Sequence, residues 1–319
     1  MTVSSSPPLV SVVVPLYNKA EHVARALGSV LTQTFQDFEI LVVDDGSTDG
    51  GATVVEGFVD PRIRLIRQAN AGVSVARNNG VDAARASLIA FLDADDAYRP
   101  DFLENALTLR ARYPAAGGFA MNYEVIDQAG LGRPGVPHTA EPTLLLDPAT
   151  YFRIGKFGSP VFSSSVVVDR AVLERAGGFP AGVRLGEDID TWLRICFIAP
   201  IAFDRRLGGI YFLDAGNRAV TTNPPPERYV FFDTIDRWVA GQPPLSREVL
   251  ADINEFKNFF SLIYARFQIR WGVPSEGRRA LINCHTRDFA LGKWKWLLAS
   301  LLPQRWQHAI GHIKQGIRS

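Results

Sequence analysis

Four short apolar runs, separated by three helical patterns, constrain the fold of this chain more than any other feature. The runs occupy residues 9–15, 38–43, 62–67 and 88–92. Their β-branched and aliphatic content is typical of strands buried in a sheet. The helical patterns occupy residues 18–33, 48–58 and 73–86. This alternation predicts an α/β fold with a mainly parallel central sheet, flanked by helices and connected by right-handed crossovers.

Polar and aromatic residues follow three of these predicted strands directly. The loops that carry them cover residues 16–19, 44–49 and 93–98. Ligands of such sheets bind beyond the carboxyl ends of the strands. We therefore expect a binding site where these three loops meet.

The loop after the fourth strand carries three carboxylates in four positions, Asp93, Asp95 and Asp96. Like charges so close together repel one another, which is unfavourable beside a core strand. A divalent cation offsets the repulsion, because Mg²⁺ and Mn²⁺ take oxygen ligands and join carboxylates to substrate phosphates. A helix cap or a solvated acidic loop would use the same residues, and the spacing alone leaves these alternatives open.

Two predicted helix starts also carry acidic or amide side chains. Asn18 and Glu21 have the spacing of a capping box, which predicts that the first helix begins there. Glu187 and Asp188 lie at the start of a later helix, where the helix dipole favours an ionised carboxylate. Such a carboxylate suits general-base chemistry, although capping and solvation of the helix start would explain it equally well.

Five motifs in order along the chain carry a resemblance to a known family. They are PLYN at 15–18, VVDDGSTD at 42–49, NAGVSVARNNG at 70–80, FLDADD at 91–96 and GEDIDTWLR at 186–194. Each is modest alone, but together they resemble the family 2 glycosyltransferases of the GT-A fold. The resemblance covers residues 9–215 and implies the GT-A nucleotide-diphospho-sugar transferase fold.

The resemblance also implies a role for each matching residue. The donor nucleotide is expected to contact Pro15, Tyr17, Asp45, Arg77 and Asp93. Asp95 is expected to bind the divalent cation, Mn²⁺ or Mg²⁺, that holds the donor diphosphate. Asp188 matches the catalytic base, while Glu187 and Asp96 are expected on the donor or acceptor side of the reaction.

These roles predict an inverting glycosyltransferase that moves a single sugar from a nucleotide-diphosphate sugar, with a UDP-sugar favoured, to an acceptor hydroxyl. The acceptor is expected to be a sugar or a lipid-linked glycan in cell-surface polysaccharide or glycoconjugate synthesis. The alternatives are a sugar nucleotidyltransferase and a non-catalytic nucleotide-sugar binding module. The first needs a glycine-rich phosphate loop after the first strand, and PLYNKAE has no glycine. The second is disfavoured because Asp95 and Asp188 are both present.

The resemblance is incomplete in the metal site and near the C-terminus. Many relatives carry a metal-binding His near the end of the GT-A region, and residues 211–222 here contain none. Asp214 or Asn217 would be the substitute, or Asp95 and phosphate oxygens would hold the cation alone. Processive synthases carry QxxRW, whereas this chain has only Gln304-Arg305-Trp306. Single-sugar transfer is therefore favoured.

Composition and charge exclude several other classes. The formal net charge is +1, whereas a protein that binds nucleic acid usually has a strong excess of basic residues. The chain has only two cysteines, which argues against a disulfide scaffold and a structural zinc site. No window approaches the roughly 20 apolar residues of a membrane span, and residues 1–8 lack the basic stretch and apolar run of a secretion signal. We therefore expect a cytoplasmic protein.

The Pro-rich stretch at 222–227 predicts a boundary between a catalytic domain, residues 1–221, and a helical C-terminal extension, residues 222–319. The extension contains Trp and Leu residues with interspersed lysines, a pattern that is compatible with peripheral contact with the inner face of a membrane. The alternatives are a helix packed back on the catalytic domain and an oligomer contact.

Overall fold

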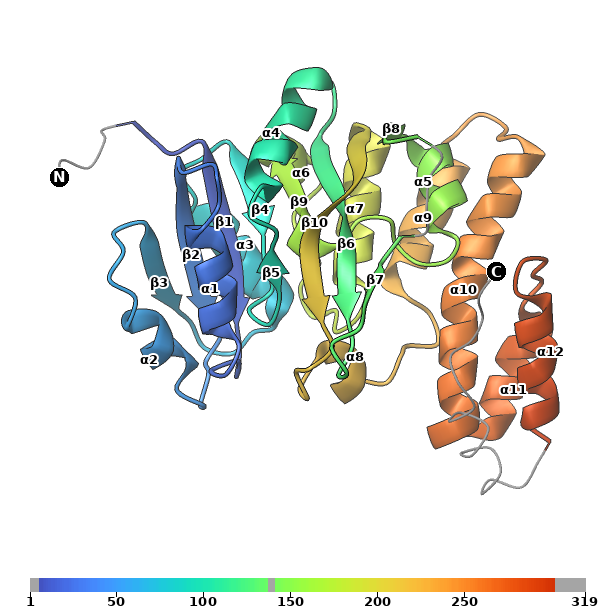
Figure 1. Cartoon of the computed structure of the whole chain (residues 1–319). Coiled ribbons are helices and arrows are strands. Elements are labelled where there is room, and N and C mark those ends of the chain that lie inside the picture. The colour runs from blue at the N-terminus through green and yellow to red at the C-terminus, as the bar shows by residue number, and fades with distance from the viewer. Residues whose placement is uncertain (1–5, 137–140, 302–319) are drawn as a thin grey trace. The chain divides into compact units, whose positions relative to one another are not determined.

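The computed structural model describes residues 6–136 and 141–301 (Figure 1). The chain divides into two compact units. The α/β unit contains residues 1–151 and 159–218, and the helical unit contains residues 152–158 and 219–319. The segment 152–158 therefore belongs to the helical unit, far ahead of the expected boundary. The residues Gln304-Arg305-Trp306 lie outside the described residues.

The α/β unit follows the predicted alternation of strands and helices. Its strands are β1 (Val10–Leu16), β2 (Phe38–Asp44), β3 (Ile63–Arg67), β4 (Leu88–Phe91), β5 (Ala97–Tyr98), β6 (Gly118–Ile126), β7 (Gly132–Pro134), β8 (Thr143–Leu146), β9 (Val166–Asp169) and β10 (Ile201–Phe212). Its helices are α1 (Val23–Leu31), α2 (Gly51–Glu56), α3 (Val73–Ala83), α4 (Phe102–Arg112), α6 (Arg170–Arg175) and α7 (Glu187–Ile198), with a 3₁₀ turn η1 (Ser163–Ser165). Helix α5 (Pro148–Gly155) begins in this unit.

All the described strands join one sheet in the order β3-β2-β1-β4-β9-β6-β10-β5, with β7 beside β6 and β8 beside β10. The first four strands are parallel, as expected for strands connected by helices. Strand β9 runs antiparallel to both β4 and β6, so the sheet as a whole is mixed. The predicted α/β fold with a central sheet between helices is confirmed.

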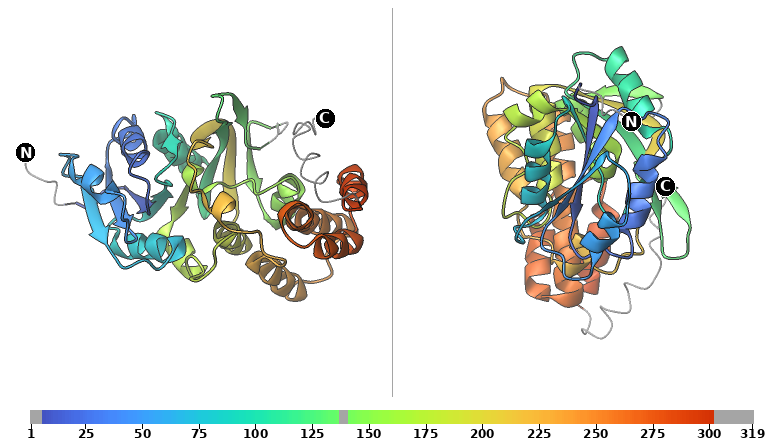
Figure 2. Two further views of the ribbon diagram at one scale, coloured as in Figure 1. Left: turned by 90° about the horizontal axis from the view of Figure 1, so that it is seen from below. Right: turned by 90° about the vertical axis from the view of Figure 1, so that its left-hand side faces the viewer.

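Helices cover both faces of the sheet. Helices α1 and α4 lie on one face, and α3, α6 and α7 lie on the other (Figures 1 and 2). The alternation of side chains along β1 explains this arrangement. The side chains of Val12 and Val14 pack with those of α1 and α4 in one hydrophobic core, whereas Val13 packs against α3. A Cβ on Gly80 of α3 would lie only 2.4 Å from Val13, so glycine permits the close approach of helix and strand.

The predicted capping box at Asn18 is wrong. Helix α1 begins at Val23, and Asn18 adopts a left-handed conformation with φ of 52°. Its side-chain oxygen accepts a hydrogen bond from the backbone N–H of Thr48 instead of capping its own helix. The Asn18 side chain therefore binds the loop after β2 and not the backbone of the helix that follows it.

The helical unit comprises α8 (Ala219–Thr222), α9 (Val230–Ala240), α10 (Arg247–Trp271), α11 (Pro274–Asn283) and α12 (Ala290–Ala299). Phe231, Phe256 and Phe260 pack together in its interior with ring centroids 4.9–5.9 Å apart. A second cluster joins α10, α11 and α12 around Ala265, Leu281 and Trp296. Within the part of the chain that the structure describes, no helix is both long and apolar enough to span a bilayer.

Candidate active site

Sheet register brings the three predicted loops to one edge, which is the lower edge of the sheet in Figure 1. Strand β1 lies between β2 and β4, and Leu16 pairs with Asp44 while Val13 pairs with Phe91. The loops that begin at Tyr17, Asp45 and Leu92 are therefore neighbours. This is the switch point at which such sheets bind ligands.

The loops after β1 and β2 are joined by hydrogen bonds. The backbone N–H of Asn18 donates to Ser47 Oγ at 3.1 Å, and Thr48 N donates to Asn18 Oδ1 at 2.8 Å. Asp49 Oδ2 accepts from the backbone N–H of Ala20 at 2.8 Å. These contacts fix the two loops to each other and leave Tyr17 48% exposed at the edge of the site. An exposed aromatic ring there is available for stacking.

Asp45 organises the loop that leads into α3. Its carboxylate accepts hydrogen bonds from the Gln68 side chain at 2.7 Å and from the backbone N–H groups of Ala71 and Gly72 at 2.8 and 2.9 Å. Gly72 has φ of 91°, a conformation that favours glycine. Asp45 is buried, so its first role is to position residues 68–72 at the edge of the predicted nucleotide site.

Arg77 is the centre of the site. Its side chain is 3% exposed, and its Nη2 donates to Asp93 Oδ1 at 2.8 Å while Nη1 donates to Glu187 Oε1 at 3.0 Å. The guanidinium also lies 5.1 Å from the centre of the Phe179 ring. Burial alone would lower the pKa of Arg77, but the carboxylates of Asp93 and Glu187 raise it above its ordinary value. Arg77 is thus a permanent cation that joins the acidic loop after β4 to the start of α7.

Glu187 and Asp188 lie in the first turn of α7, which follows Gly186 with φ of 83°. Burial and the neighbouring Asp188 raise the pKa of Glu187 to about 7, although Arg77 opposes the shift. Burial also raises the pKa of Asp188, against the effect of Arg77. The two carboxyl groups therefore lie in an environment where a proton is taken up more readily than in water.

Asp95 already has a cationic neighbour, Lys19, which the sequence analysis did not single out. Lys19 Nζ lies 2.6 Å from Asp95 Oδ2, and both side chains are nearly buried. The carboxylate of Asp95 thus already binds one cation, the Lys19 ammonium. Carboxylate oxygens are also ligands that Mg²⁺ and Mn²⁺ prefer. Among the described residues no three His, Cys, Asp or Glu side chains form a metal cluster. The site fits a divalent cation only if phosphate oxygens or water complete its coordination.

The residues considered as substitutes for the missing His have other partners. Asp214 pairs with Arg25 at 2.7 Å, and Arg25 also donates to the backbone carbonyl of Asp95 at 2.6 Å. Asn217 donates from its side-chain amide to the backbone carbonyl of Asn18 at 2.7 Å. Both residues therefore support the walls of the site near Asp95, without a direct contact to its carboxylate.

Asp96 lies beneath the acidic loop and is 1% exposed. Its Oδ2 accepts from Ser164 Oγ at 2.6 Å, and its Oδ1 accepts from Phe212 N at 3.3 Å. Ser164 Oγ in turn accepts from the backbone N–H of Asp93 at 3.1 Å. This arrangement directs the carboxyl group into the protein, and the contact of Asp96 with donor or acceptor stays a prediction.

Sequence reasoning missed Ser164 and Asn78 as well as Lys19. Asn78 exchanges two hydrogen bonds with the backbone of Phe179, at 2.8 and 2.9 Å, and so ties α3 to the segment before α7. Asn78 belongs to the motif NAGVSVARNNG and Lys19 directly follows PLYN, so their positions in or next to these motifs could have identified both as candidate site residues. Ser164 lies in a run of three serines with no local signal of its role.

The fold and the acidic site define the class of nucleotide-sugar transferases with a GT-A fold. The model of the family described as glycosyl transferase family 2 matches residues 11–157. The chain is 31% identical over 192 residues to the putative teichuronic acid biosynthesis glycosyltransferase TuaG of Bacillus subtilis, covering 59% of this chain and 72% of that protein. This chain belongs to glycosyl transferase family 2.

Other similarities are more local or concern the fold alone. The chain is 41% identical over 101 residues to the uncharacterized glycosyltransferase YibD of Escherichia coli, which is 31% of this chain and only 29% of that protein. It superposes on S. aureus TarS 1–349 in complex with UDP-GlcNAc with a TM-score of 0.66 and 20% identity, over 92% of this chain and 90% of that one. The mannosyltransferase PcManGT of Pyrobaculum calidifontis in complex with GDP-Man and Mn²⁺ gives a TM-score of 0.54 at 18% identity, over 98% of this chain and 89% of that one.

Proposed function

We propose that this chain is an inverting glycosyltransferase that moves one sugar from a nucleotide-diphosphate sugar to an acceptor hydroxyl. The carrying observation is the bridge from Asp93 through Arg77 to Glu187, which brings the predicted donor loops and the start of α7 into one site. A transferase needs the donor and the catalytic base side by side, and the bridge supports this because Glu187 directly precedes the proposed base Asp188. The catalytic domain in this proposal is residues 1–221, and the extension is residues 222–319.

The donor side of the proposal uses the sheet edge around Tyr17. Pro15 and the exposed ring of Tyr17 would lie against the base, with Asp45, Arg77 and Asp93 on the nucleoside and diphosphate side. A UDP-sugar is favoured because the fold is similar to that of TarS in its complex with UDP-GlcNAc. The neighbour with GDP-Man shows that the same fold accepts a different base.

Asp95 is the residue proposed to hold Mn²⁺ or Mg²⁺ through its carboxylate. When bound, the cation would supply Lewis-acid stabilisation of the charge on the leaving diphosphate. A structural neighbour in complex with GDP-Man and Mn²⁺ supports a divalent cation in a protein of this fold. Arg77 would add a permanent positive charge next to Asp93, on the same side of the site.

Asp188 is proposed as the general base. As the acceptor oxygen forms its bond to the anomeric carbon, the bond from that carbon to the diphosphate oxygen breaks, and the acceptor proton moves to the Asp188 carboxylate. Displacement from the opposite face inverts the anomeric configuration. Burial raises the pKa of Asp188, which makes it a better proton acceptor than an exposed carboxylate while Arg77 keeps the ionised form accessible.

The acceptor is proposed to be a sugar or lipid-linked glycan in cell-surface polysaccharide or glycoconjugate synthesis, at the cytoplasmic face of a membrane. TuaG, the relative named for teichuronic acid biosynthesis, supports a cell-surface product. Leu291, Trp294 and Leu298 are 89%, 62% and 66% exposed on one face of α12. From residue 260 to 319 the chain has ten Lys or Arg and two acidic residues. An exposed apolar face within a basic segment suits an anionic lipid surface.

The test of the transferase proposal combines nucleotide binding with a single substitution. Thermal shifts with UDP, GDP and dTDP, with and without Mn²⁺, should show stabilisation by at least UDP, and failure of all three contradicts a donor site. Asp188→Asn should abolish transfer and hydrolysis of the donor while UDP still binds. Asp82→Asn, which changes an exposed carboxylate on α3, is the matched control and should keep activity. A nucleotidyltransferase would instead form pyrophosphate from a sugar phosphate and a nucleoside triphosphate.

A further inference from the structure

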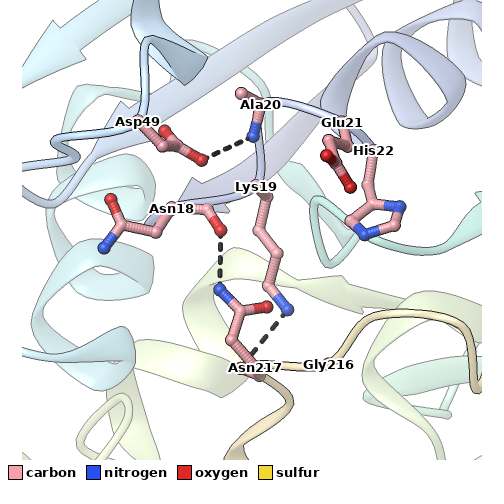
Figure 3. A pocket seen from close by; sticks show the side chains of 8 residues that line it. All are labelled: Asn18, Lys19, Ala20, Glu21, His22, Asp49, Gly216 and Asn217. Atoms are coloured by element: carbon pink, nitrogen blue, oxygen red, sulfur yellow. Dashed lines mark hydrogen bonds between the residues drawn. The ribbon is translucent and has the colours of Figure 1, made fainter.

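Lys19 is held in the site by the carboxylate that is proposed to bind the metal. Its Nζ lies 2.6 Å from Asp95 Oδ2 and 3.5 Å from the backbone carbonyl of Asn217. The side chains of Lys19 and Asp95 are 12% and 11% exposed, so water screens this ion pair only weakly. Figure 3 shows the Lys19 side chain extending from its loop toward Asn217.

The backbone on both sides of Lys19 is fixed, and Lys19 lines a hollow in the protein surface. Asn18 and Ala20 are each hydrogen-bonded to the loop after β2. Lys19 itself lines a hollow of about 310 Å³ together with residues of the loops after β1 and β2 and with Gly216 and Asn217 of the segment after β10 (Figure 3). Displacement of the ammonium from Asp95 therefore requires a change in the Lys19 side chain, toward the hollow that this residue lines, while the backbone keeps its hydrogen bonds.

A lysine ammonium and a divalent cation cannot share the same carboxylate oxygen. Two positive charges a few ångströms apart repel strongly, and the repulsion grows where water is excluded. The backbone carbonyl of Asp95 also accepts from the Arg25 guanidinium, so this carboxylate lies in cationic surroundings before any metal arrives. A metal ion that binds Asp95 Oδ2 must displace Lys19.

We propose that Lys19 is an intramolecular competitor of the divalent cation and, when displaced, a ligand of the donor diphosphate. Without donor, the ammonium neutralises Asp95 and keeps metal affinity low. A bound diphosphate offers the displaced ammonium a new anionic partner, so metal and nucleotide bind cooperatively. The competition rests on the proposed metal ligand Asp95, and the second half rests on the proposed diphosphate donor as well.

Linkage makes the proposal quantitative. If nucleotide strengthens metal binding, metal must strengthen nucleotide binding by the same factor, and couplings of this kind are about 5–150-fold. Removal of the Lys19 charge should raise the affinity of the free protein for Mn²⁺ and reduce the coupling to UDP. A lysine that only stabilises the fold would change neither quantity.

The experiment is a Mn²⁺ titration followed by electron paramagnetic resonance of free Mn²⁺, with and without UDP. Lys19→Met and Lys19→Gln should bind Mn²⁺ about tenfold more tightly than the unmodified chain when UDP is absent. In the unmodified chain UDP should increase Mn²⁺ affinity, and this increase should shrink in both variants. Asp95→Asn should lose the Mn²⁺ binding, and Lys257→Met, which removes a lysine paired with Asp236, should behave as the unmodified chain.

Equal Mn²⁺ affinity in Lys19→Met, Lys19→Gln and the unmodified chain would overturn the competition. Retained Mn²⁺ binding in Asp95→Asn would also overturn it, because the metal would then bind elsewhere. If no variant binds UDP, the proposed function fails and the diphosphate role of Lys19 falls with it. The titration without UDP still decides the competition on its own.

Discussion

Arg77 Nη1 donates a hydrogen bond to Glu187 Oε1 at 3.0 Å across 110 positions of sequence. The same guanidinium binds Asp93, so one buried cation holds two acidic segments that would otherwise repel each other. The contact places the helix that begins with Glu187 and Asp188 beside the loop after β4. Arg77 is thus the direct link between these two acidic segments.

Replacement of Arg77 should therefore be costly to stability as well as to activity. Arg77→Met leaves Asp93 and Glu187 without their common partner, and loss of one member of a buried ion pair typically costs about 3–5 kcal/mol. Urea unfolding followed by circular dichroism measures this change. Arg67→Met removes an arginine from an exposed pair with Glu56 and should cost no more than about 1 kcal/mol. Equal losses in the two variants would contradict the central role of Arg77.

The raised pKa of Glu187 predicts a pH-dependent contribution to stability. Folded Glu187 keeps its proton to about pH 7, whereas the ordinary value is 4.5. Between these values the folded state binds more protons, so the free energy of unfolding should fall as pH rises, by at most about 3 kcal/mol. Below this window both states are protonated and above it both are ionised, so the contribution is constant there.

Glu187→Gln removes this titration, and urea unfolding from pH 4 to 8 measures it. The free-energy difference between the unmodified chain and the variant should decrease from pH 4.5 to 7 and then stay constant. Glu21→Gln, which changes an exposed carboxylate, is the control and should show no such trend. A difference that is independent of pH would be inconsistent with a raised Glu187 pKa.

Ser164 should contribute to stability by supporting the acidic loop. Ser164→Ala removes the hydrogen bond to Asp96 and the acceptor for the backbone N–H of Asp93, at an expected cost of about 1–3 kcal/mol. The adjacent Ser163 is a matched control, because its hydroxyl is also buried but has no hydrogen-bond partner. Ser163→Ala should be neutral or stabilising by thermal unfolding. The prediction fails if Ser163→Ala is the more damaging change.

The exposed face of α12 should bind anionic lipid. Replacement of Leu291, Trp294 and Leu298 by serine should reduce co-sedimentation with phosphatidylglycerol vesicles, while pure phosphatidylcholine vesicles should bind the unmodified chain weakly. Val59→Ser changes a fully exposed apolar residue of the α/β unit and should leave vesicle binding unchanged. Unchanged binding in the triple variant would contradict lipid binding by this face and favour a protein partner, such as a second copy of the chain.

Much of the fold was predictable because its signals are local. Strands β1, β2 and β4 are almost entirely buried. A strand that is covered on both faces needs a continuous run of apolar residues, and such runs can be recognised in the sequence. The places of Asp45, Asp93 and Asp188 after strands or at a helix start were predictable for the same reason. The start of α1 was not, because Asn18 bonds to Thr48 from the neighbouring loop rather than to its own helix.

The sequence by itself determined the family, the strand and helix alternation of the first 92 residues, and the loops in which acidic residues gather. Only the tertiary structure decided the partners of those residues: Arg77 with Glu187, Lys19 with Asp95, and Ser164 with Asp96. The physical reason is range. Burial patterns and turn preferences act within a few residues, whereas these contacts join segments 68 to 110 positions apart, and only sheet order and register bring such segments together.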